Sequence, residues 1–375
     1  MPSPYIKSIH RLFLKNLAVK KNENILIFTD TDTGANDYPP LHYKIAKLIA
    51  AEGKKFANII FHAYPSTGSH GAEPPITLWQ LAFGKEIINE FRKQKILRPL
   101  LNKTATEKQI KMAHAIVGAQ NLVPLHSKIN AVIALAWFST THTNFRKLLT
   151  QSFGIRYASM PLFDVKMLAG PMNVDVKKLS RETILLARYL SNAHTAEITT
   201  PDGTNLHFSL KGRQGHADTG VLTKDGSMSN LPCGEAYIAP VEGTAKGKLV
   251  ARFSQTRTLK EPLIFEIKEG HVKKISGEEK DKKRLEQVFK KYPKACVLAE
   301  FGIGTNKKAK RPDNILEAEK ILGTIHIAFG DNSTFGGVNK VPFHEDFVIF
   351  KPTVKLYFRG KKPSILIKRG KTIIE

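Results

Sequence analysis

The chain has 375 residues, a mass of 41.8 kDa and a formal net charge of +25, with 58 basic and 33 acidic residues. This length predicts two domains, and a composition of 42% hydrophobic and 24% charged residues excludes disorder as the main state. The longest apolar run, residues 131–138, is much shorter than the roughly 20 residues of a membrane-spanning helix. No secretory signal is evident, and Cys233 and Cys296 are too few for a disulfide framework. We therefore expect a cytoplasmic protein without membrane contact.

The positive charge is spread along the chain. The excess of basic over acidic residues is +13 in residues 1–200 and +12 in residues 201–375, so neither half is a basic tail. The most basic stretch before the C-terminus, residues 268–294, also contains several acids, which is typical of a solvated helix face. No helix-turn-helix, zinc-finger or aromatic RNA-binding pattern accompanies the charge. We expect no nucleic-acid partner.

The first half of the chain alternates strands with helices. A helical stretch over residues 7–19 precedes an apolar strand at 25–28. Further strands are predicted at 56–61 and 131–137, with a helix over 78–91 between them. This order favours a parallel sheet with helices on its faces. The loop after the first strand lacks G-x-G-x-x-G, so a dinucleotide site has little support.

The second half is mostly β. The tripeptide Pro201-Asp-Gly separates two alternating runs and predicts a hairpin. A helix is predicted over 278–292 and the exposed face of another over 317–320, and the remaining predicted strands lie at 235–238, 247–253, 263–267, 272–275, 295–300, 324–329 and 343–350. We place the boundary near residue 190. The expected architecture is an α/β N-terminal domain over residues 1–190 and a β-rich α+β metal-binding domain over residues 191–375.

Acidic and histidine side chains occupy strand positions where polar groups are costly. Glu300 ends an apolar run, and His326 shares its strand face with a threonine and an alanine. Period-two alternation places His344 and Asp346 on one face of their strand and turns the residue between them away. Glu235 follows a glycine at the start of another strand.

A bound metal would allow these five groups to satisfy one another. A buried carboxylate costs several kcal/mol unless it is paired or coordinated. Oxygen and nitrogen ligands without thiolates suit Zn, Mn or Co, and five ligands suit two metals rather than one. Structural alternatives remain open: His344 and Asp346 as a simple hydrogen-bonded pair, Glu300 paired with a nearby lysine, and His326 as a buried core histidine.

Four motifs in the second half resemble the aminopeptidase T family of metallo-aminopeptidases. They cover most of residues 230–355, and the N-terminal half fits more loosely. The motifs are Leu231-Pro-Cys-Gly-Glu-Ala-Tyr-Ile, Ala299-Glu-Phe-Gly-Ile-Gly-Thr-Asn, Lys320-Ile-Leu-Gly-Thr-Ile-His-Ile-Ala-Phe-Gly-Asp-Asn and His344-Glu-Asp-Phe.

The resemblance implies a role for each of the five residues. Glu235 and Glu300 match the family's metal-binding glutamates, His326 its G-T-x-H histidine, and His344 with Asp346 its final H-x-D pair. It also implies a homodimeric exopeptidase that uses two divalent ions (Zn, Co or Mn) to remove N-terminal residues from peptides with a free amino terminus. Glu300 or Glu235 would then also be catalytic, carrying the proton to the leaving amine.

One departure from the family concerns a tyrosine near the metals. Many members have it a few residues after the G-T-x-H histidine, whereas this chain has Asp331-Asn-Ser-Thr-Phe there. Tyr237 shares a strand face with Glu235, although we expect it to be a core residue. Two other functions stay open: a metal-dependent hydrolase of a non-peptide amide, and a basic binding protein whose acid–histidine cluster is structural.

Overall fold

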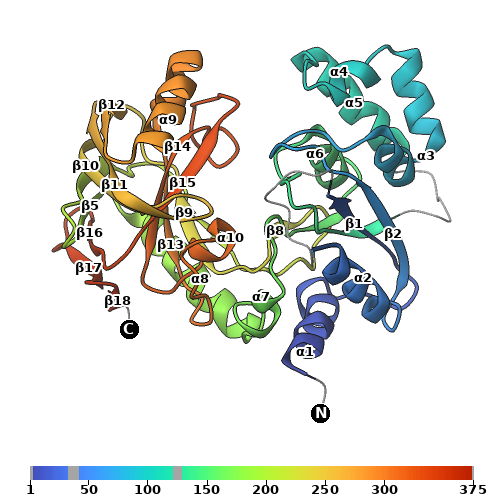
Figure 1. Cartoon of the computed structure of the whole chain (residues 1–375), viewed down its shortest axis with the longest axis horizontal. Helices are drawn as coiled ribbons and strands as arrows, with labels where there is room; N and C mark the ends of the chain where they lie inside the picture. The colour runs from blue at the N-terminus through green and yellow to red at the C-terminus, as the bar shows by residue number, and fades with distance from the viewer. Residues whose placement is uncertain (1–2, 33–41, 121–128, 374–375) are drawn as a thin grey trace. The chain divides into compact units, whose positions relative to one another are not determined.

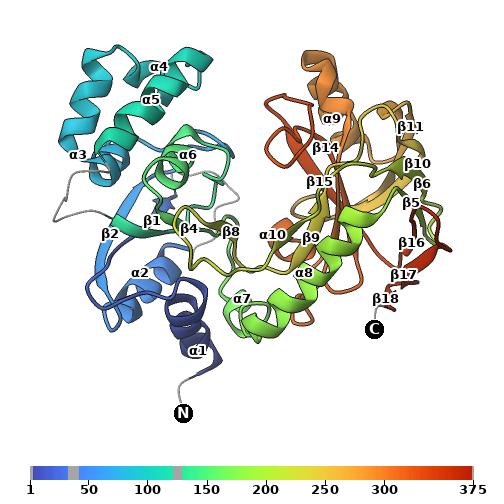
Figure 2. The ribbon, with the colours of Figure 1, turned by 180° about the vertical axis from the view of Figure 1, so that it is seen from behind.

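The computed structural model of the chain describes residues 3–32, 42–120 and 129–373 (Figures 1 and 2). The chain divides into two compact units. The first comprises residues 1–173 and 220–232, and the second residues 174–219 and 233–375. The boundary near residue 190 that we predicted from the sequence falls inside the second unit, close to the end of a helix. Over the described residues, no helix combines the length and the apolar character that crossing a membrane requires.

The first unit is built on a five-stranded parallel sheet in the order β2-β1-β3-β4-β8. Its strands are β1 (Asn24–Thr31), β2 (Asn58–Pro65), β3 (Ile129–Ala134), β4 (Arg156–Ser159) and β8 (Met228–Asn230). Its helices are α1 (Pro4–Arg11), which continues as a π-helix (Leu12–Asn16), α2 (His42–Gly53), α3 (Ile76–Lys93), α4 (Leu97–Leu101), α5 (Glu107–Gln120), α6 (Asn144–Gln151) and α7 (Lys166–Ala169).

Helices cover both faces of this sheet, as Figures 1 and 2 show. Because side chains alternate along β1, Leu26 and Phe28 pack into a cluster with residues of α3 to α6, such as Trp79. Ile25 and Ile27, on the other face of β1, are equally buried. The first half of β1 is therefore a continuous apolar run, as expected for an inner strand of a parallel sheet that is buried on both sides.

The second unit contains two antiparallel sheets and two longer helices. One sheet has eight strands in the order β12-β11-β10-β6-β5-β16-β17-β18. These are β5 (Thr195–Thr199), β6 (Asn205–Ser209), β10 (Lys246–Phe253), β11 (Thr258–Lys268), β12 (His271–Ser276), β16 (Thr353–Tyr357), β17 (Ser364–Lys368) and β18 (Lys371–Thr372). The longer helices are α8 (Val176–Asn192) and α9 (Glu279–Lys291), and α10 (Ile315–Ala318) is short.

The other sheet has five strands in the order β15-β14-β13-β9-β7. They are β7 (His216–Asp218), β9 (Glu235–Ile238), β13 (Leu298–Gly304), β14 (Ile325–Gly330) and β15 (His344–Ile349). One face of this sheet packs against the eight-stranded sheet: the ring centroids of Phe265 and Phe329 lie 5.0 Å apart, and those of Phe208 and Phe301 5.4 Å apart. The opposite face of the five-stranded sheet carries the polar residues of interest.

Both fold classes expected from the sequence are confirmed: a parallel α/β sheet in the N-terminal half and a β-rich C-terminal half. The hairpin around Pro201-Asp-Gly joins β5 to β6. One strand is displaced from its prediction. The strand predicted at 295–300 runs from Leu298 to Gly304, because Pro293–Cys296 forms a short 3₁₀-helix instead.

Candidate metal centre

Five polar side chains predicted to form a site lie together on one face of the five-stranded sheet. They alternate with core residues: Ile325 and Ile327 enter the hydrophobic core, whereas His326 lies on the other face. The alternation predicted for the last strand is also observed, because Glu345 points away from the site and pairs with Arg284 at 2.5 Å. The five residues come from β9, β13, β14 and β15, and they are Glu235, Glu300, His326, His344 and Asp346.

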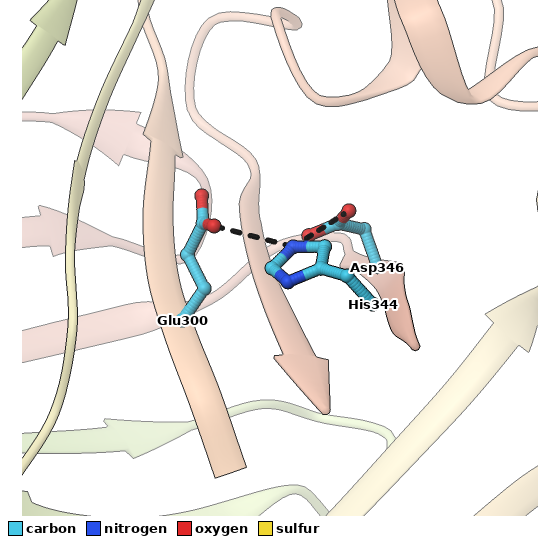
Figure 3. A group of neighbouring side chains, drawn as sticks. All are labelled: Glu300, His344 and Asp346. Carbon is cyan, nitrogen blue, oxygen red and sulfur yellow. Dashed lines mark ion pairs between the residues drawn. The ribbon is translucent and has the colours of Figure 1, made fainter. Parts of the chain in front are cut away.

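Glu300 lies at the centre of this group. Its Oε1 is 3.3 Å from Nε2 of His326, and its Oε2 is 3.3 Å from Nε2 of His344. Each imidazole then contacts a second carboxylate. His326 Nε2 is 3.4 Å from Glu235 Oε2, and His344 Nε2 is 3.4 Å from Asp346 Oδ2. Figure 3 shows Glu300, His344 and Asp346 directed toward one another, and ligand atoms of these three lie within 4.8 Å.

The ring of His344 is oriented by the backbone. Its Nδ1 lies 2.7 Å from the carbonyl oxygen of Asp331, so Nδ1 carries a proton and donates it to that carbonyl. This bond directs Nε2 toward Glu300 and Asp346. Although burial alone would lower the pKa of His344, the two carboxylates raise it well above its usual value. Two carboxylates of the group therefore face the same ring nitrogen, Nε2.

His326 owes its position to a glycine on the neighbouring strand. Gly302 lies opposite His326 in the β13–β14 register, and a Cβ at residue 302 would be 1.9 Å from Nε2 of the imidazole. Burial alone would lower the pKa of His326, but the hydrogen bond to Glu300 and the charge of Glu235 raise it to about 9. The same contacts with the histidines hold the pKa of Glu300 below its usual range, against the effect of burial.

The spacing and the unmet polar atoms fit divalent metal ions. Three buried atoms of the group have no hydrogen-bond partner within the described residues: Glu235 Oε2, His326 Nδ1 and Asp346 Oδ1. The contacts of 3.3–3.4 Å between imidazole and carboxylate atoms are longer than charge-assisted hydrogen bonds, which are about 2.7–2.9 Å. Two ligands bound tetrahedrally to one zinc would be about 3.3 Å apart.

A buried lysine that no sequence pattern singled out adjoins the centre. Lys320 has no exposed surface, and its Nζ lies 2.7 Å from Glu235 Oε1 and 2.8 Å from Glu319 Oε2. Burial raises the pKa of Glu319 to about 8, although the Lys320 charge opposes this shift. The expectation that residues 317–320 form an exposed helix face is wrong, since Glu317 is buried as well. The sequence pattern of residues 317–320 did not reveal this burial. The helix covers only Ile315–Ala318, so helical periodicity does not describe the whole stretch.

Tyr237 lies on the same face as the candidate ligands rather than in the core, contrary to our expectation. Its neighbours Ala236 and Ile238 enter the hydrophobic core, whereas its own ring stacks on His216 with centroids 5.4 Å apart. The ring of Phe335 contacts Tyr237 edge-on at 5.5 Å, and it also lies 6.1 Å from the ring of His344. These rings form an aromatic wall beside the centre.

Comparison with known proteins places this geometry in a family. The family model described as "NicX: 2,5-dihydroxypyridine 5,6-dioxygenase" matches residues 163–359, which is more than half of the chain. The chain belongs to this family. The matched region contains all five candidate ligands of this NicX-family chain. No curated protein matches the sequence significantly.

Two solved structures share the whole fold. The 2,5-dihydroxypyridine dioxygenase from Pseudomonas putida KT2440 is 16% identical, with a TM-score of 0.66 and coverage of 100% of this chain and 99% of that one. AmpT from Thermus thermophilus is 13% identical, with a TM-score of 0.62 and 99% of each chain covered. The fold expected from the aminopeptidase T resemblance is thus confirmed. Membership of this family identifies the chain as an enzyme.

Proposed function

We propose that the chain is a two-metal exopeptidase that hydrolyses the N-terminal peptide bond of peptides. The central position of Glu300 carries this proposal. Its two oxygens face two different imidazoles, and each imidazole faces a further carboxylate. Two halves follow. The Asp346 half consists of Glu300, His344 and Asp346, and the Glu235 half consists of Glu300, His326 and Glu235. A carboxylate shared between two such halves suits a pair of divalent ions.

Divalent ions at this centre would lower the pKa of a bound water and polarise the scissile carbonyl. The protein's part is to hold the ligands and to move protons. Glu235 or Glu300 would accept the proton of the attacking water and return it to the leaving amine. Their strand positions keep both carboxylates on the buried face where the reacting bond would lie.

Tyr237 would supply a hydroxyl group to this centre, since the chain lacks the tyrosine that many aminopeptidase T members have near the metals. The phenol lies on the ligand face of β9, opposite Gly302 in the β9–β13 register. Because Gly302 has no side chain, Tyr237 and His326 can both occupy the face around that position. A neutral phenol there would donate a hydrogen bond to the oxyanion that develops during hydrolysis. Tyr237 would thereby stand, on a different strand, in place of the tyrosine of those aminopeptidase T members.

A second candidate function follows from the family match: an oxygen-dependent cleavage of a hydroxylated pyridine ring. The description of the family names that activity. Non-haem iron dioxygenases commonly bind Fe(II) with two histidines and one carboxylate. Here three carboxylates accompany two histidines, and both imidazoles contact Glu300. We therefore place hydrolysis first.

A substrate panel separates the two. The full chain, loaded in parallel with Zn²⁺, Co²⁺, Mn²⁺ or anaerobic Fe²⁺, is given short peptides, their N-acetylated counterparts, aminoacyl-anilides and simple amides. Release of the N-terminal residue from free peptides but not from acetylated ones supports the exopeptidase. Cleavage of amides that lack an α-amine would indicate another metal-dependent hydrolase. Oxygen consumption with 2,5-dihydroxypyridine, without peptide cleavage, would indicate the dioxygenase.

A further inference from the structure

Lys320 places a positive charge directly against one half of the candidate centre. It lies between α10 and β14, and its ammonium is wholly buried. Burying a charge costs several kcal/mol unless partners compensate it. Here Glu235 and Glu319 do so, at 2.7 Å and 2.8 Å. The ammonium thus lies between the carboxylates of Glu235 and Glu319, and the charge of Asp218 adds to theirs.

The backbone holds Lys320 in this place. The carbonyl oxygen of Lys320 accepts a hydrogen bond of 2.8 Å from the backbone N–H of Asn306. The segment packs directly on Gly304, where a Cβ would lie 2.1 Å from the carbonyl oxygen of Ile321. Gly304 is also the residue opposite Glu235 in the β9–β13 register. The close approach that this glycine permits therefore delivers the ammonium to that carboxylate.

This contact leaves Glu235 with one oxygen for another partner. Oε1 receives the Lys320 ammonium, whereas Oε2 faces His326 and has no hydrogen bond within the described residues. The Asp346 half differs. In the described part of the chain, neither Glu300 nor Asp346 forms an ion pair with a lysine or an arginine. Among the described residues, a lysine therefore pairs with a carboxylate of the Glu235 half and none pairs with His344's carboxylate partners.

We propose that Lys320 is a positioning residue that makes the two halves unequal, so that the Glu235 half binds a divalent cation more weakly than the Asp346 half. Lys320 holds one oxygen of Glu235 away from the cation and repels the cation electrostatically. The centre then loads in order, and the Asp346 half fills first. This inference rests on the two-metal centre of the proposed function, but it does not depend on which bond the enzyme cleaves.

Calorimetric titration of the metal-free full chain with Mn²⁺ tests the proposal. The wild type should show two binding events whose Kd values differ at least tenfold. Lys320→Met should tighten the weaker event about tenfold or more and leave the tighter event within about threefold. Lys307→Met is the matched control, since Lys307 is a largely exposed lysine whose Nζ is 3.8 Å from Glu182. It should leave both events unchanged.

A second variant should change the Kd of the weaker binding event in the opposite direction, and it tests the proposal even if Lys320→Met does not fold. Glu319→Gln replaces the second partner of the ammonium by a neutral amide. In titrations above pH 8, where Glu319 is charged in the wild type, the ammonium of the variant therefore bears more fully on Glu235. The weaker event should then weaken several-fold further. An unchanged or weakened second event in Lys320→Met, or an unchanged one in Glu319→Gln, would overturn the inference. If the wild type binds no ion, both this inference and the proposed function fail. If it binds ions as expected but cleaves no peptide, only the proposed function fails.

Discussion

The imidazole of His326 lies across the backbone of Gly302, so closely that a Cβ at residue 302 would be 1.9 Å from Nε2. The two residues face each other on adjacent strands. An absent side chain on β13 thus makes room for a ligand from β14. This relationship explains how His326 reaches between Glu235 and Glu300 without leaving its own strand.

Gly302→Ala should therefore displace His326 and weaken metal binding at the Glu235 half by at least tenfold. The overall fold should survive, since the added methyl group meets a side chain and the glycine has no positive φ. Metal titration followed by circular dichroism checks both points. Gly118→Ala is the control, because nothing lies within 4 Å of a Cβ there. An alanine at 302 with wild-type metal affinity would show that His326 is not a ligand.

Removing the central ligand should reduce the number of bound metal ions more than removing a peripheral ligand does. Glu300→Ala should lose both ions because Glu300 belongs to both halves, whereas His344→Ala should lose at least the ion of the Asp346 half. Hydrolysis should disappear in both variants. Metal content after gel filtration gives the stoichiometry, with the exposed His207→Ala as the control. Two tightly retained ions in either ligand variant would contradict the assignment.

The phenol of Tyr237 should affect the chemical step rather than substrate binding. Loss of one oxyanion donor lowers kcat by about 100-fold or more. Tyr237→Phe should show this loss with little change in KM and with unchanged metal stoichiometry, since the ring contacts with His216 and Phe335 are kept. Tyr357→Phe also deletes a hydroxyl, one that donates to Glu197 at 2.6 Å on the other sheet, and should leave kcat unchanged. A kcat within about threefold of wild type in Tyr237→Phe would remove Tyr237 from the mechanism.

Glu73 should make the stability of the first unit depend on pH. Its carboxylate accepts the backbone N–H groups of Asn144 and Phe145 at the start of α6, and burial raises its pKa to about 7, from an ordinary 4.5. The folded unit therefore binds a proton more tightly than the unfolded chain. Its free energy of unfolding should fall as pH rises from about 4.5 to 7, by up to about 1.4 kcal/mol per pH unit from this group.

Urea unfolding at pH 5 and pH 7.5 measures this dependence. Fluorescence reports on the first unit because both tryptophans, Trp79 and Trp137, belong to it. Glu73→Gln carries no titrating group and should lose less stability over that range than the wild type. The exposed Glu86→Gln should behave as wild type. Equal losses in wild type and Glu73→Gln would contradict the assignment of the pKa.

Local patterns in the sequence predicted which side chains share a strand face. The alternation of His344 and Asp346 against Glu345 is a property of a single strand, and it appears in the structure as expected. The alternating runs likewise identified β5 and β6 as a hairpin. Such patterns depend only on neighbouring residues, which is why one sequence suffices to read them.

The arrangement between strands could not be read in this way. The central position of Glu300 depends on β13 lying between β14, the next strand in the chain, and β9, which is distant in the sequence. Lys320 gave no signal because it lies in an irregular segment, where neither helical nor strand periodicity applies. Tyr237 was misjudged because alternation separates two faces of a strand without showing which one is the core.

Anomalous diffraction from crystals grown with Zn²⁺ or Mn²⁺, recorded at the metal's absorption edge, tests the two-metal centre most directly. We predict two peaks on either side of the Glu300 carboxylate, one contacting His344 and Asp346 and the other contacting His326 and Glu235. The peak beside His344 should have the higher occupancy at limiting metal. A single ion bound by both histidines and one carboxylate, or no ion near Glu300, would contradict the account.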